Sequence, residues 1–138
     1  MIEIGEGIVR NRTHVAMDGM GVFAFTMSKV PKCIKNLLEN FCIDVDEVDY
    51  LLLHQANQYI DEKIRKKMRF SKDKTPYCLE KFGNTSSGTI PMTMVTKISE
   101  QLRGGKNKLV MSGFGAGLSW AAVYVETEFI EVLPLIEI

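Results

Sequence analysis

The run VDYLLL at residues 48–53 limits the possible folds more than any other segment of this chain. It is short, apolar and bounded by acidic residues, which is typical of a strand covered on both faces. Such a strand needs helices on either side of it. Apolar side chains at three- and four-residue steps predict one helix before it, over residues 22–41, and another after it, over residues 56–68. Pro31 is expected to kink or split the first helix.

The other segments extend this pattern. Residues 1–16 are a lead-in with a short strand near 13–17, and a second short strand is predicted at 77–79. A loop at 82–91 (FGNTSSGTIP) leads into a helix that reaches Leu102 and stops at Gly104-Gly105. A strand at 107–112 (NKLVMS), a tight turn at 113–117 (GFGAG) and a returning strand at 118–127 follow, before an apolar, unassigned tail. Ser86 or Ser87 is the expected N-cap, with Pro91 in the first turn. The order predicts the α/β class, with a mixed, mostly parallel sheet covered by helices.

Length and composition limit the number of domains, the class of partner and the cellular compartment that can be expected. A chain of 138 residues fits one domain, expected over residues 17–138, and 17 basic against 17 acidic residues give no overall attraction to nucleic acid or a membrane. Cys33, Cys42 and Cys78 form no CxxC pair, which argues against a disulfide framework or a zinc site and favours a reducing compartment. No run is long enough for a membrane span and the start does not resemble a signal peptide. We therefore expect a cytoplasmic protein without metal or cofactor.

Polar and glycine-rich segments follow three of the predicted strands. They are HQAN at residues 54–57, FGNTSSG at 82–88 and GFGAG at 113–117. Ligands of open α/β sheets bind at the carboxyl ends of the strands, so His54 and Asn84 are expected to be neighbours there. Each segment alone has a structural explanation: a histidine that caps a loop, a Gly-Asn turn and a hairpin turn. Their joint placement favours a functional site.

The segments LLLHQAN, FGNTSSGTIP and GFGAGLSW, preceded by MDGMGVFAF, resemble the C-terminal half of the β-ketoacyl-acyl-carrier-protein synthase III family, in the thiolase-like superfamily. The resemblance runs over residues 17–125 and implies a thiolase-like half-fold. It implies that His54 and Asn84 belong to a Cys-His-Asn triad. Their side-chain N–H groups would donate to the oxygen of a malonyl thioester, which becomes an enolate on decarboxylation and attacks an acyl-cysteine. It also implies a backbone donor in the loop Gly115, Ala116 and Gly117, with Ala116 as the donor.

The resemblance does not extend to the nucleophilic cysteine. In this family that cysteine belongs to the N-terminal half, which the chain lacks. Cys33, Cys42 and Cys78 are expected to be small buried hydrophobes. The chain is therefore expected to be inactive alone and to need the missing N-terminal half as a partner. Exposed apolar surface, on the first helix and the last strand, is expected to make it self-associate.

Further partners follow from the resemblance: acyl carrier protein, malonyl and acyl thioesters, and a second copy in a homodimer. Tyr59 stands where the family often has an arginine that holds the carrier protein. The basic residues Lys63, Lys66 and Lys67, with Arg65 and Arg69, are candidates to replace it, and a solvated helix face is the alternative. Asp61 and Glu62 early in this helix and the basic residues late in it suit the helix dipole. The alternative function is a non-catalytic module that docks carrier protein or a partner chain.

Overall fold

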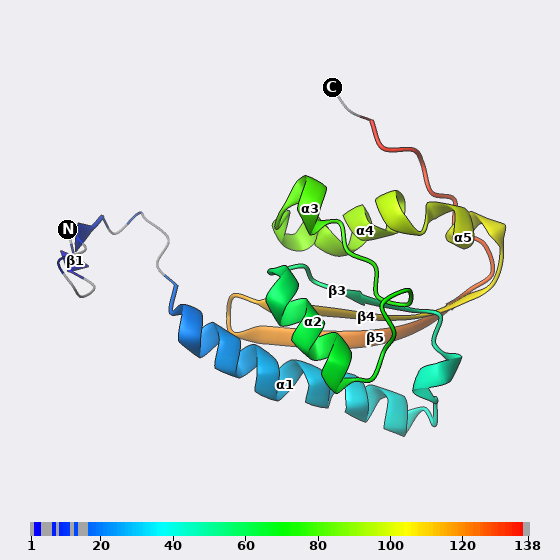
Figure 1. Ribbon diagram of the computed structural model, residues 1–138, viewed down its shortest axis with the longest axis horizontal. Helices are drawn as coiled ribbons and strands as arrows, with labels where there is room; N and C mark the ends of the chain where they lie inside the picture. The colour runs from blue at the N-terminus through cyan, green and yellow to red at the C-terminus, as the bar shows by residue number, and fades with distance from the viewer. Residues whose placement is uncertain (1, 4–6, 8, 12, 14–16, 137–138) are drawn as a thin grey trace.

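The structure, a computed structural model, describes residues 2–3, 7, 9–11, 13 and 17–136. Two short strands near the N-terminus, β1 (Ile2–Glu3) and β2 (Val9–Arg10), pair antiparallel with each other and lie apart from the main body (Figure 1). The strand expected near residues 13–17 falls largely on residues 14–16, outside the described residues.

The first long element is the helix α1 (Gly19–Asn40). Asp18 caps it, because its carboxylate accepts the Gly21 N–H at 2.9 Å. Pro31 lies buried inside this helix and does not split it into two helices. Proline lacks the N–H that would bond the carbonyl four residues earlier, Met27. The Lys67 Nζ donates to that carbonyl at 2.9 Å instead, which satisfies it from a second helix.

The main sheet has the strand order β3-β4-β5. Its strands are β3 (Tyr50–Leu53), β4 (Asn107–Gly115) and β5 (Ser119–Thr127). β3 pairs parallel with β4, and β4 pairs antiparallel with β5 as a hairpin. The predicted α/β class and the mixed sheet are confirmed. The main sheet is not mostly parallel, however, because only the β3–β4 pair is parallel and the β4–β5 pair is antiparallel. The other elements are η1 (Val45–Glu47), α2 (Gln58–Lys67), α3 (Leu79–Phe82), η2 (Ser86–Gly88), α4 (Thr89–Lys97) and α5 (Ser99–Gly104).

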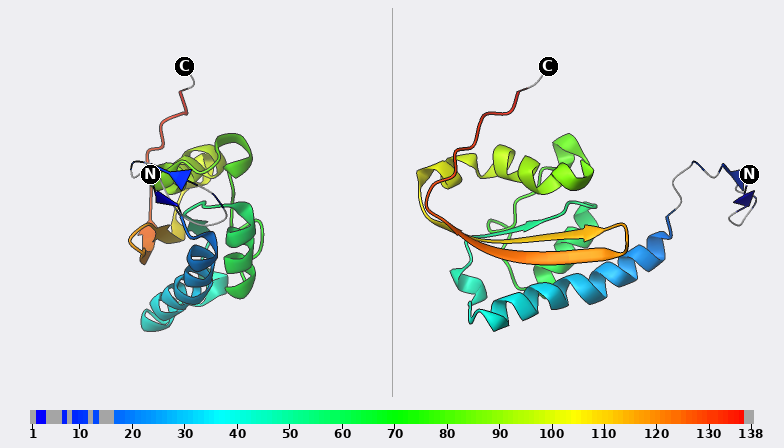
Figure 2. Two further views of the ribbon diagram at one scale, coloured as in Figure 1. Left: turned by 90° about the vertical axis from the view of Figure 1, so that its left-hand side faces the viewer. Right: turned by 180° about the vertical axis from the view of Figure 1, so that it is seen from behind.

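Helices cover the sheet from both sides, in three layers (Figure 2). Side chains alternate between the two faces of a strand. Leu51 and Leu53 therefore pack with α1 and α2, whereas Leu52 packs with α4 and α5. All three leucines are buried, which confirms that residues 48–53 contain a strand covered on both faces. Among the described residues, no helix is long and apolar enough to span a membrane.

Three local predictions are wrong. Residues 77–79 form no strand: the Cys78 N–H donates to the Gln55 side chain at 2.9 Å, and Leu79 begins α3. Neither Ser86 nor Ser87 caps the next helix, because both lie in η2 and Gly88 precedes α4. That helix also does not run unbroken to Leu102, since α4 ends at Lys97 and α5 begins at Ser99. Its stop at Gly104 is confirmed.

The cysteines differ in burial. Cys78 is buried as expected, although outside any strand, and Cys33 is partly buried. Cys42 is exposed, so the prediction of a buried thiol is wrong for it. It follows the end of α1 with a φ of 53°, in the left-handed region.

Candidate active site

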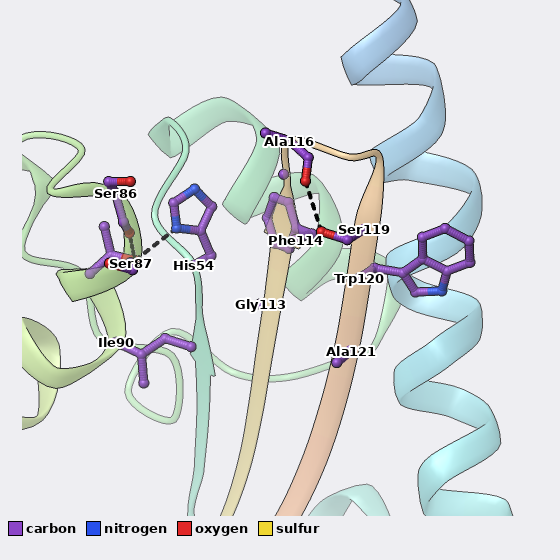
Figure 3. A pocket seen from close by; sticks show the side chains of 12 residues that line it. His54, Ser86, Ser87, Ile90, Gly113, Phe114, Ala116, Ser119, Trp120 and Ala121 are labelled. Carbon is purple, nitrogen blue, oxygen red and sulfur yellow. Dashed lines mark hydrogen bonds between the residues drawn. The ribbon is translucent and has the colours of Figure 1, made fainter.

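The carboxyl end of β3 meets the β4–β5 hairpin at one edge of the sheet. His54 directly follows β3, and its backbone N–H donates to the Ser112 carbonyl of β4 at 2.8 Å. A cavity of about 500 Å³ opens here between this edge and the start of α4 (Figure 3). It is lined by His54, Ser86, Ser87, Thr89, Ile90, Gly113, Phe114, Gly115, Ala116, Ser119, Trp120 and Ala121.

The His54 imidazole is held from two sides. Its Nδ1 lies 2.8 Å from the Thr89 Oγ1, at the start of α4. The Phe114 ring meets it edge-on from β4, with 5.3 Å between ring centroids and 83° between planes (Figure 3). Burial lowers the pKa of His54 below its usual value, and the Ser86 backbone opposes this effect. The imidazole is therefore neutral at neutral pH, with Nε2 as its remaining polar atom.

Asn84 lies close to the same segment but not in the cavity wall. It follows Gly83, whose φ of 63° favours glycine. The Asn84 Oδ1 accepts the Ser86 N–H at 2.9 Å, and its Nδ2 lies 3.5 Å from the Ala56 carbonyl, two residues after His54. The structure thus brings the HQAN and GNTS segments together. It places no hydrogen bond between the two described side chains of His54 and Asn84.

The predicted glycine turn is wrong in its bounds. Residues 113–115 end β4, and only residues 116–118 form the turn. The Ser119 Oγ donates to the Ala116 carbonyl at 2.8 Å across this turn. Gly115 and Ala116 line the cavity, and Gly117 does not. Gly117 has a φ of 141°, and a Cβ there would lie 2.9 Å from the Ser119 nitrogen, so the turn requires glycine.

A buried polar network, which the sequence did not predict, lies behind the cavity. Thr89, Thr93 and Gln55 are each at most 1 % exposed. The Gln55 Nε2 donates to the Thr93 Oγ1 at 2.7 Å, and the Thr93 hydroxyl donates to the Thr89 carbonyl at 2.8 Å. The only sequence signal is the four-residue spacing of the two threonines, which puts them on one face of a helix.

The basic residues of α2 do not form a uniform free face. The Arg65 guanidinium pairs with Glu62 at 2.8 Å and donates to the Phe70 carbonyl at 2.6 Å. The Lys63 ammonium lies 5.2 Å from the Tyr59 ring centroid, and Lys67 is bound to α1 as described above. Their role in docking stays a prediction.

Comparison with known proteins identifies the family to which this chain is similar. The family model 3-oxoacyl-(acyl-carrier-protein) synthase III C terminal matches residues 38–127. The β-ketoacyl-acyl-carrier-protein synthase III of Streptococcus gordonii is 40% identical over 114 residues, covering 81% of this chain and 35% of the relative. The β-ketoacyl-acyl-carrier-protein synthase III of Synechococcus elongatus is 41% identical over 125 residues, covering 88% of this chain and 35% of the relative.

Solved structures give the same assignment. The crystal structure of the 3-oxoacyl-(acyl-carrier protein) synthase from Burkholderia xenovorans superposes with a TM-score of 0.82 at 32% identity, covering 86% of this chain and 34% of that one. The thiolase-like fold is thereby shown. The chain spans about a third of the length of the curated relatives it matches. With most of its length matched in sequence and in structure, the chain belongs to the 3-oxoacyl-(acyl-carrier-protein) synthase III C-terminal family.

Proposed function

We propose that this chain supplies one half of the active site of an enzyme that forms carbon–carbon bonds by decarboxylative Claisen condensation. The observation that carries the proposal is the neutral His54 imidazole at the cavity, held at Nδ1 and leaving Nε2 for a substrate. An Nε2–H that faces a thioester oxygen becomes a stronger partner as that oxygen gains negative charge. It therefore stabilises the transition state more than the bound substrate.

The reaction begins with a malonyl thioester in the cavity. Its carboxylate leaves as carbon dioxide, and the electron pair of the broken bond forms an enolate on the thioester. The enolate carbon then attacks the carbonyl of an acyl group held as a thioester on a cysteine, and the cysteine thiolate leaves. A backbone N–H near Ala116 is the proposed donor to that acyl oxygen, because Gly115 and Ala116 line the same cavity as His54.

Asn84 is proposed as the second donor to the enolate oxygen. The Ser86 N–H binds its Oδ1, which directs the Nδ2 end to the opposite side, where Ala56 lies. Asn84 is exposed and outside the cavity wall, so the carboxamide must turn toward the cavity when substrate binds. This exposure is the one observation that favours the alternative function, a non-catalytic docking module.

The nucleophile is proposed to come from another polypeptide segment. None of the three described cysteines lines the cavity. The N-terminal part of the relatives, which this chain does not match, is the proposed source. By itself the chain is then inactive in condensation. In the assembled enzyme we propose acyl carrier protein and acyl thioesters as partners, a homodimer, and a cytoplasmic location.

The test combines this chain with the cysteine-bearing N-terminal half of the Streptococcus gordonii relative. Acyl loading of the cysteine and decarboxylation of malonyl thioester are measured separately. His54→Ala is expected to lower the decarboxylation rate by about two to three powers of ten and to leave loading intact. Ser87→Ala, at another cavity-lining position, is the matched control and should change neither step. Equal loss of both steps in His54→Ala would reject the donor role. Normal decarboxylation in that variant would support the docking module.

A further inference from the structure

The orientation of His54 depends on a hydroxyl group from a different element. Thr89 is the first residue of α4, 35 positions after the histidine, and it is 1 % exposed. Its Oγ1 lies 2.8 Å from the His54 Nδ1. A neutral imidazole has one nitrogen that donates and one that accepts, and the partner of one nitrogen decides which form is present.

The hydroxyl has one proton and two acceptors within reach. Besides Nδ1, the Ser86 carbonyl lies 3.2 Å from the Thr89 Oγ1. That carbonyl already accepts the backbone N–H of Thr89, so it is satisfied without the hydroxyl. Nδ1 lies closer to the hydroxyl oxygen than that carbonyl does, at 2.8 Å against 3.2 Å. If the hydroxyl proton points to the Ser86 carbonyl, Nδ1 carries a proton and donates to the Thr89 Oγ1, whereas a proton on the bond to Nδ1 leaves that nitrogen bare and accepting. The shorter contact and the carbonyl that is already satisfied favour the second arrangement.

The position of this hydroxyl is itself fixed. One turn further along α4, the Thr93 Oγ1 donates to the Thr89 carbonyl and accepts from the Gln55 Nε2. The Gln55 Oε1 in turn accepts the Cys78 N–H at 2.9 Å. Gln55 is the residue next to His54. The network therefore ties the first turn of α4 directly to the end of β3 and sets the distance between Thr89 and the imidazole.

We propose that Thr89 is a positioning residue that donates its hydroxyl proton to the His54 Nδ1 and so holds the neutral imidazole with its proton on Nε2, toward the cavity. The importance of this tautomer for catalysis rests on the proposed function, since an enolate oxygen needs a donor. The tautomer itself is a property of this chain alone. An imidazole with its proton on Nδ1 would present a lone pair to the cavity and repel the enolate.

The test is nitrogen-15 NMR of the histidine rings in this chain, at a pH above the pKa of His54. Two-bond proton–nitrogen correlations distinguish a protonated ring nitrogen from a bare one. The chain has one other histidine, His14, and a His14→Asn variant assigns the signals. Wild-type His54 is expected to show a protonated Nε2 and a bare Nδ1. Thr89→Val, which replaces the hydroxyl with a methyl group, should shift His54 toward the form with its proton on Nδ1, because the Ser86 carbonyl is the acceptor that remains.

Two variants serve as controls. Thr89→Ser keeps the hydroxyl and should keep the wild-type tautomer. Thr96→Val removes a hydroxyl on the same helix that donates to the Met92 carbonyl at 2.7 Å, and it should leave His54 unchanged. A wild-type His54 with its proton on Nδ1 would overturn the proposal, as would a folded Thr89→Val with the wild-type tautomer. Should Thr89→Val fail to fold, the wild-type tautomer and Thr89→Ala decide. A failed decarboxylation assay would reject the proposed function and leave these spectra unaffected.

Discussion

At the scale of single residues, the charge state of Asp61 differs most from what its local sequence predicts. Its place early in α2 suggested a charge that favours the helix dipole. The carboxyl group is fully buried, however, and neither oxygen has a partner among the described residues. Burial, with a smaller contribution from the Glu62 charge, raises the pKa of Asp61 to about 8. Asp61 is therefore protonated at neutral pH and adds no charge to the start of the helix.

The raised pKa of Asp61 predicts a stability that falls as pH rises. The folded chain holds a proton on this carboxyl up to a pH of about 8, whereas the unfolded chain loses it near pH 4. Between these values the folded state binds more protons, so the free energy of unfolding should fall by about 1.4 kcal/mol per pH unit from this group. Urea unfolding at several pH values measures the slope.

Two substitutions isolate the Asp61 contribution. Asp61→Asn should remove that part of the slope. Glu62→Gln is the neighbouring control and should keep most of it, because burial is the larger cause of the raised Asp61 pKa and the Glu62 charge the smaller one. Parallel pH profiles for the wild type and Asp61→Asn would contradict the burial argument.

At the scale of elements, α1 and α2 are joined through a defect in the first helix. Pro31 leaves the Met27 carbonyl without its usual donor, and Lys67 of α2 supplies one. This contact explains how a proline can lie inside a continuous helix of 22 residues. Lys67, a candidate for docking an acidic partner, therefore also has a structural role as the donor to the Met27 carbonyl.

A double-mutant cycle tests the link between the two helices. Lys67→Ala should lower the free energy of unfolding by about 0.5–1.5 kcal/mol in the chain with Pro31. In a Pro31→Ala background the same change should cost almost nothing, because the alanine N–H can bond the Met27 carbonyl. Lys66→Ala is the matched control, with an expected change within about 0.5 kcal/mol in both backgrounds. Additive effects of Lys67→Ala and Pro31→Ala, measured by chemical unfolding, would show that the contact does not couple the helices.

At the scale of the whole molecule, the main sheet is only partly covered. β5 is its edge strand in the order β3-β4-β5, and Trp120 and Val123 on it are 43% and 45% exposed. Large apolar side chains are also exposed near the start of α1, at Met20, and in the tail, at Phe129. Exposed strand edges with apolar side chains favour pairing between chains.

Self-association of the isolated chain is therefore expected. Light scattering at micromolar concentration should give an average mass above that of one chain. Val123→Lys should lower this mass, because a charge on an edge strand opposes pairing. Phe41→Lys replaces an exposed apolar residue at the end of α1, away from the edge strand, and is expected to have little effect. A monodisperse monomer of the wild-type chain would contradict this prediction.

Patterns of neighbouring residues were enough to predict the elements whose faces depend on local spacing. Periodicity located α1, α2, β3 and the β4–β5 hairpin, because the faces of a helix or strand depend on the spacing of nearby residues. Hydrogen bonds between residues far apart in the sequence depend instead on the folded arrangement of the elements. Gln55 accepts the Cys78 N–H in the segment 77–79, which forms no strand. Lys67 donates to the Met27 carbonyl that Pro31 leaves without a donor, and the Thr89 hydroxyl contacts His54. These partners could not be predicted, since buried polar groups pair with whatever the fold brings near them, at separations that no local pattern records.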